Sequence, residues 1–67
     1  MNKVSPKVRG IISDFVWNAT VGSGDDRQPT AEDVVRLEAK LGGPLTTDEA
    51  ALFRSRWQEE LQCMAHP

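Results

Sequence analysis

Length, composition and charge set narrow bounds on this chain. It has 67 residues, with 8 Lys and Arg against 10 Asp and Glu, and a formal net charge of −2 at pH 7. A chain of this size forms one small domain and buries only about 60% of the surface that its unfolded form exposes. The mixed charge argues against a polybasic nucleic-acid arm and against a highly acidic DNA mimic.

The residue content also indicates the compartment. Cys63 is the only cysteine, so no internal disulfide can form, and a lone thiol fits a reducing environment. The N-terminal residues lack the apolar stretch of a signal peptide. No apolar run approaches the ~20 residues that a membrane span needs. We therefore expect a cytoplasmic protein with no membrane partner.

The first predicted element is a helix over about 6–21. Ser5 is placed to cap it, and Pro6 suits the first helical position because its missing N–H would be unpaired there anyway. Gly22 is the expected stop. Apolar residues recur at three- and four-residue spacing along the segment, which is typical of one buried helix face: Val8, Ile11, Ile12, Phe15, Val16 and Ala19.

A polar loop, 22–30, is expected to lead into a second helix over 31–41. The loop is rich in turn-forming residues. Thr30 is the predicted N-cap. Gly42 can adopt the left-handed conformation that ends many helices, and Pro44 prevents continuation. The expected buried stripe of this helix is Val34, Leu37 and Leu41.

The third helix, over 47–64, has the clearest start. Thr46 and Glu49 fit a capping box, in which each side chain accepts a hydrogen bond from the other residue's backbone amide. Its expected inner face is Ala50, Phe53, Trp57, Leu61 and Met64. The chain is thus predicted to be a single all-α domain, 1–67, built as a small three-helix bundle with a longer C-terminal helix. The predicted core is Val8, Ile11, Ile12, Phe15, Val16, Val34, Leu37, Leu41, Leu45, Phe53, Trp57, Leu61 and Met64.

A few residues do not fit these stripes. On a helical wheel at 100° per residue, Trp17 points nearly opposite to the first stripe, and Gly10 and Val21 fall on the same outer side. Leu52 lies away from the stripe of the third helix. One interpretation is that the first helix is buried on two sides and Trp17 packs on a neighbour. The other is a partner-facing or dimer-facing surface centred on Trp17, because tryptophan is enriched among residues that dominate binding.

Catalytic and metal-binding patterns are not found. The sequence contains no phosphate-cradling glycine loop, and the single histidine, His66, is next to the final residue. Cys63 and His66 would supply at most two ligands, whereas a structural zinc site needs four. We expect no catalytic residues, no metal and no cofactor, and hence no enzyme.

The segment from Ala31 to Trp57 has the outline of a helix-turn-helix. The residues that would contact bases include Asp48 and Glu49, whose carboxylates oppose binding to phosphates. A basic face built from both ends of the chain would favour DNA binding, whereas scattered arginines would count against it. The residues concerned are Lys3, Lys7, Arg9, Arg54 and Arg56.

The predicted function is a non-catalytic regulator that binds or inhibits another protein through a helix face, with a homodimer left open. The predicted partner-binding residues are Trp17, Gly10, Val21 and Leu52. A helix-turn-helix-like DNA-binding transcriptional regulator is the alternative.

Overall fold

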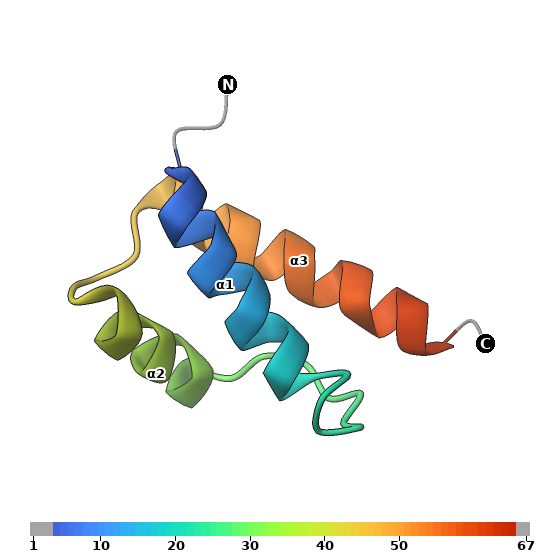
Figure 1. The fold of residues 1–67 in the computed structure, drawn as a ribbon. Coiled ribbons are helices and arrows are strands. Elements are labelled where there is room, and N and C mark those ends of the chain that lie inside the picture. Colours follow the sequence, from blue (N-terminus) through green and yellow to red (C-terminus); the bar gives the residue numbers. More distant parts are fainter. Residues whose placement is uncertain (1–3, 66–67) are drawn as a thin grey trace.

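Three helices make up the fold, as the sequence predicts. The computed structural model describes residues 4–65, in which α1 spans Pro6–Ala19, α2 spans Ala31–Leu41 and α3 spans Thr47–Ala65 (Figure 1). Within these residues no strand is present. The all-α, three-helix class with a longer C-terminal helix is confirmed.

The first helix begins where predicted and ends two residues early. The Ser5 hydroxyl accepts a hydrogen bond from the Val8 backbone N–H at 3.3 Å, and Pro6 opens the helix. At the other end Thr20 leaves helical geometry, with φ −111° and ψ −85°. Its hydroxyl donates to the Val16 carbonyl at 2.7 Å in a fully buried position. The Gly22 N–H then donates to the Trp17 carbonyl at 2.8 Å, across five residues instead of four. The helical bonding pattern therefore stops at Ala19, two residues before the predicted boundary.

The caps of the other two helices are confirmed. Thr30 accepts from the Asp33 backbone N–H and forms a capping box with the Asp33 side chain. Gly42 closes α2 in the left-handed region, with φ 85°. Thr46 and Glu49 exchange backbone-to-side-chain hydrogen bonds of 2.9 and 3.1 Å at the start of α3.

Helix α1 is the centre of the arrangement. It packs against both other helices, whereas within residues 4–65 no Cα atom of α2 comes within 8 Å of one in α3. Figure 1 shows α1 crossing α3, with α2 to one side of both. The molecule measures 33 × 26 × 16 Å along its principal axes. It is therefore only about two helix layers deep.

The core is small because the fold is thin. Its buried apolar residues are Val4, Ile12, Val16, Leu37, Phe53 and Trp57. Seven more predicted core residues are only half-buried and pack around this cluster: Val8, Ile11, Phe15, Val34, Leu41, Leu45 and Leu61. The Phe53 ring is the aromatic centre, with its centroid 6.2 Å from that of Phe15 and 5.5 Å from that of Trp57.

Two differences from the predicted core have a positional reason. Val4, which precedes α1, was missed and is 7% exposed. Met64 is half-buried but lies outside the cluster described for residues 4–65. It lines a shallow hollow with loop residues such as Gly24 and Asp26, so the last turn of α3 has the polar loop as its neighbour.

Among the described residues, no helix combines the length and the apolar character that crossing a membrane requires.

Candidate functional site

Trp17 lies on the surface, on the side of α1 away from the core. Its side chain is 49% exposed, whereas Ile12 and Val16 of the same helix are fully buried. One interpretation placed the first helix at the centre, buried on two sides, with Trp17 packed on a neighbour. Helix α1 does pack on both other helices, but Trp17 lies outside the core cluster, so only the first part of that interpretation is confirmed. An exposed tryptophan is a large apolar group left in water, which makes this position a candidate contact for another molecule.

The Trp17 ring is held against the backbone that follows α1. A Cβ atom added at Gly22 would lie 2.9 Å from Cζ3 of the indole and 3.1 Å from the Cα atom of Asn18. The Gly22 N–H donates to the Trp17 carbonyl at 2.8 Å. Gly22 was expected only to stop the helix, yet its lack of a side chain is what allows the indole to approach. The exposed ring is thus supported on one side by its own chain.

Two other predicted binding residues are also exposed. Val21 is 37% exposed, and Gly10 is exposed with no atom within 4 Å of where its Cβ would be. Gly10 and Trp17 are seven residues apart, so they lie two helical turns from each other on one side of α1. Val21 follows the end of α1 at Ala19, so the helical wheel no longer fixes the side on which it lies. We call these three exposed residues, Gly10, Trp17 and Val21, the Trp17 face.

Leu52 does not extend this face. It is half-buried and packs against the core cluster. The helical wheel placed it away from Phe53 and Trp57, but α3 packs through an arc wider than that stripe, and this arc includes Leu52. The expectation that it lies apart from the core is wrong, and its part in binding stays a prediction.

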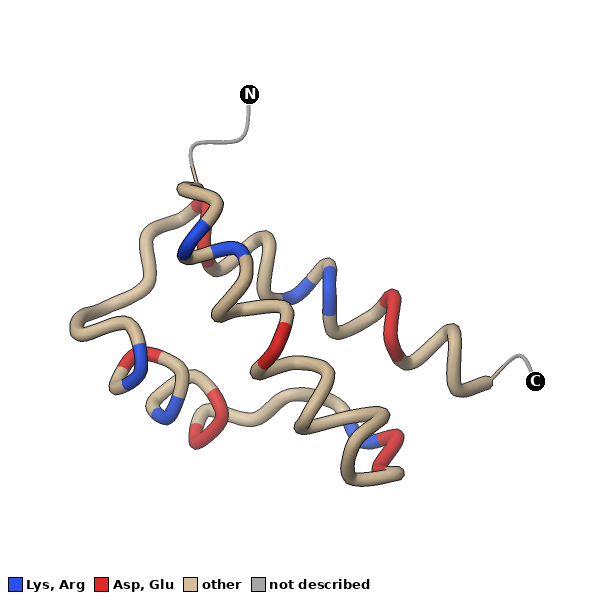
Figure 2. Tube along the Cα trace, viewed as in Figure 1, with Lys and Arg blue, Asp and Glu red and all other residues tan. Residues whose placement is uncertain are grey.

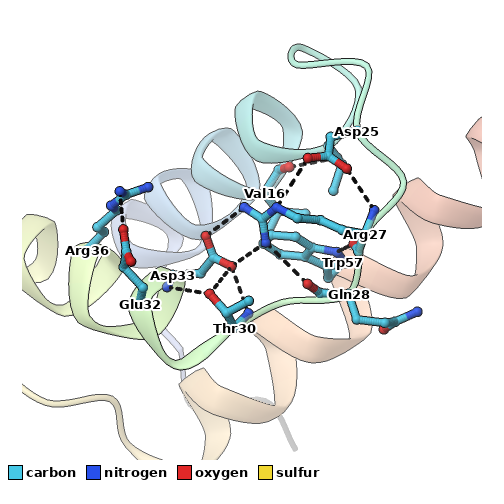
Figure 3. Close-up of polar contacts among 10 residues, drawn as sticks. Val16, Asp25, Arg27, Gln28, Thr30, Glu32, Asp33, Arg36 and Trp57 are labelled. Carbon is cyan, nitrogen blue, oxygen red and sulfur yellow. Dashed lines mark hydrogen bonds and ion pairs between the residues drawn. The ribbon is translucent and has the colours of Figure 1, made fainter.

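A polar network that the sequence did not reveal joins the loop after α1 to α2 (Figure 3). Asp33, in the first turn of α2, is only 2% exposed. The Arg27 guanidinium binds its carboxylate through two hydrogen bonds, of 2.7 and 3.0 Å. Thr30 donates to the same carboxylate from its backbone N–H at 2.8 Å and from its hydroxyl at 3.0 Å. The buried charge is therefore fully paired, which is what makes its burial tolerable.

These contacts shift the protonation equilibria of both partners. Hydrogen bonds from the Arg27 guanidinium, aided by those from Thr30, lower the pKa of Asp33 to about 2, and they outweigh the opposing effect of burial. The pKa of Arg27 is raised, chiefly by the same hydrogen bond to Asp33. Asp33 consequently remains ionised at neutral pH and has no proton to transfer.

The same arginine ties the loop to α3. Its backbone carbonyl accepts a hydrogen bond from Nε1 of Trp57 at 2.9 Å. Its guanidinium carbon lies 5.3 Å from the centroid of the Trp57 ring, within the range of a cation–π contact (Figure 3). Of this network, the sequence predicted only the N-cap at Thr30. Arg27 and Trp57 are 30 residues apart, so no local signal could have joined them.

The basic residues do not assemble into one face. Arg54 and Arg56 are two positions apart on α3, so they point about 200° from each other. Arg56 is also paired with Glu59 and Glu60. Figure 2 shows the remaining positive charge divided among the helices. Lys7 and Arg9 are exposed near the start of α1, and Lys3 lies outside the described residues. No observation favours the DNA-binding alternative, which stays a prediction.

Residues 4–65 contain no group of three or more His, Cys, Asp or Glu side chains placed to hold a metal ion. Cys63 is exposed and unbridged, and His66 lies outside the described residues.

Comparison with known proteins gives no match: no protein-family model, no curated protein and no solved structure matches this chain. Function is therefore inferred from the chain's own geometry.

Proposed function

We propose that this protein is a small non-catalytic regulator that binds another protein through the Trp17 face. The observation that carries the proposal is the indole of Trp17, half exposed yet supported by Gly22. An aromatic side chain held in place loses little conformational freedom on binding and can fill a pocket of a partner. Gly10, open on the same side of α1, would let a partner approach the helix backbone closely.

Among residues 4–65, the one deeply buried ionisable group is in a state that supports a non-catalytic role. Asp33 has its carboxylate engaged by Arg27 and Thr30. A general acid or base needs a pKa near the working pH, whereas that of Asp33 is about 2. Its ion pair with Arg27 instead holds the loop after α1 against α2. The free, exposed thiol of Cys63 fits a cytoplasmic setting, which we include in the proposal.

The experiment compares three immobilised proteins for capture of partners from an extract of the source cells: wild type, Trp17→Ala and Val35→Ala. Val35 is a matched control because it is 63% exposed on α2, outside the Trp17 face. We expect a partner that wild type and Val35→Ala retain and Trp17→Ala loses. Equal capture by all three proteins would exclude the Trp17 face as the binding surface.

A second variant tests whether the partner approaches the backbone of α1 closely at Gly10. Because a side chain there meets open space, Gly10→Gln should fold as wild type does, as circular dichroism would show. With the partner from the capture experiment, we expect at least about tenfold weaker binding, the effect of one misplaced group at an interface hot spot. Unchanged affinity would place the contact away from Gly10.

A further inference from the structure

A groove separate from the Trp17 face runs between α1 and α2. Its volume is about 550 Å³, and the side provided by α1 includes the apolar residues Ile11, Phe15 and Ala19. All three are half-buried, so the inner stripe of α1 is only partly covered by its own chain. None of the three residues of the Trp17 face lines this groove.

Most charged groups along the groove are paired within the chain. Arg36 binds Glu32, and Arg27 binds both Asp33 and Asp25. Two remain: Asp14, which is the only acidic residue of α1, and Lys40 of α2. Neither forms an ion pair in the part of the chain that the structure describes, including with the other. Figure 2 shows the acidic position near the middle of α1 and basic positions on α2.

A groove with an apolar side and opposite unpaired charges on its two walls is complementary to itself. In a two-fold symmetric dimer, any contact of one wall with the other is made twice, so two opposite charges on one chain form two ion pairs between copies. A second copy of the chain supplies both opposite charges in the order that the two walls need. We infer that the groove is a self-association surface in which α1 of each copy lies along the groove of the other. Asp14 of one copy then pairs with Lys40 of the second.

The shape of the chain is consistent with this occupant. A fold 16 Å deep leaves Ile11 and Phe15 partly in contact with water, and a second α1 helix would cover them. Burial of apolar surface supplies the affinity, and the two ion pairs set the register. The Trp17 face stays exposed in this dimer and can bind another partner. The dimer and the proposed function can therefore be tested independently.

Charge reversal provides the test, with the mass in solution measured by light scattering during size exclusion. We expect wild type to have twice the chain mass of 7.4 kDa. Asp14→Lys and Lys40→Glu should each raise the dissociation constant about tenfold or more, because each places like charges opposite one another twice. Arg9→Glu, an exposed charge reversal on α1 that is not part of the groove lining, should leave the mass unchanged. Circular dichroism checks the fold, and the neutral variants Asp14→Asn and Lys40→Gln should show smaller effects in the same direction.

The decisive measurement mixes the two reversed variants in equal amounts. Lysine at position 14 then meets glutamate at position 40, while Asp14 meets Lys40, so native mass spectrometry should show a heterodimer where neither variant dimerises alone. A monomeric wild type at every concentration would overturn the inference. So would a dimer insensitive to both reversals, or a mixture without heterodimer. Trp17→Ala should keep the dimer, which distinguishes this surface from the one in the proposed function.

Discussion

The two tryptophans of this chain lie in opposite environments. Trp57 is fully buried, with its ring against Phe53 and its N–H bonded to the Arg27 carbonyl. Trp17 is half exposed and rests on Gly22. Both stand at helical positions whose neighbours are partly polar. The difference shows that tertiary contacts, and not residue type, decide whether a large aromatic group contributes to folding or is left available for binding.

Removal of Trp57 should have the largest effect. Trp57→Ala leaves a cavity and an unpaired carbonyl at Arg27, a loss of about 3–5 kcal/mol in the free energy of unfolding. A domain of this size has about 3–10 kcal/mol in total. We expect thermal denaturation followed by circular dichroism to show no cooperative transition. A cooperative transition near the wild-type temperature would mean that the Arg27–Trp57 contact does not hold the loop.

Removal of the Asp33 charge should have the second-largest effect on the free energy of unfolding, and this effect should depend on pH. Its pKa is 3.8 when unperturbed and about 2 in the folded protein. The carboxylate therefore stabilises the fold at all pH values well above 3.8, and this contribution is lost as the pH falls towards 2. Asp33→Asn should lower the free energy of unfolding by about 2 kcal/mol at pH 7.

Urea denaturation at several pH values measures this effect. The difference between wild type and Asp33→Asn should shrink between about pH 5 and pH 2. Asp26→Asn, in the same loop, is the control, because Asp26 is exposed and forms no ion pair among residues 4–65. A difference that stays constant with pH would show that ionisation of Asp33 does not contribute.

Two glycine variants test the surroundings of Trp17. Gly22→Ala would place the new Cβ 2.9 Å from Cζ3 of the indole and 3.1 Å from the Cα atom of Asn18, so the helix backbone must shift as well as the ring. We expect it to destabilise the fold by about 1 kcal/mol. Gly10→Ala meets open space within α1 and should stabilise the fold by about 0.5–1 kcal/mol, as alanine does in a helix. In thermal denaturation, Gly22→Ala should lower the melting temperature and Gly10→Ala should raise it. A shift in the same direction for both variants would contradict the close packing of the indole on Gly22.

Trp17→Ala should change stability least, by about 0.5 kcal/mol or less, as for most surface substitutions. Its fluorescence then comes from Trp57 alone, since the chain has two tryptophans. We expect emission at shorter wavelength than in wild type and weak quenching by acrylamide. Strong quenching would mean that Trp57 is reached by solvent, and the contrast between the two residues would fail.

Local chemistry predicted the helices well. The caps at Ser5, Thr30 and Thr46 all form with partners three residues away. Gly42 adopts the left-handed conformation that the sequence indicates. The first helix was predicted to reach about residue 21 but ends at Ala19, because the Gly22 N–H bonds to the Trp17 carbonyl across five residues. Helical periodicity alone cannot show at which turn the backbone leaves the four-residue bonding pattern.

The number of helices, the residue at which each begins and the apolar stripes that face inward were all predictable from the sequence. These properties depend on hydrogen bonds and spacings within four residues of chain, so they can be read locally. Packing between the segments, by contrast, makes Asp33 a buried ion, brings Leu52 into contact with the core and bonds Trp57 to the carbonyl of Arg27. Such outcomes depend on contacts between segments as far apart as Arg27 and Trp57, and burial becomes defined only when the helices have packed.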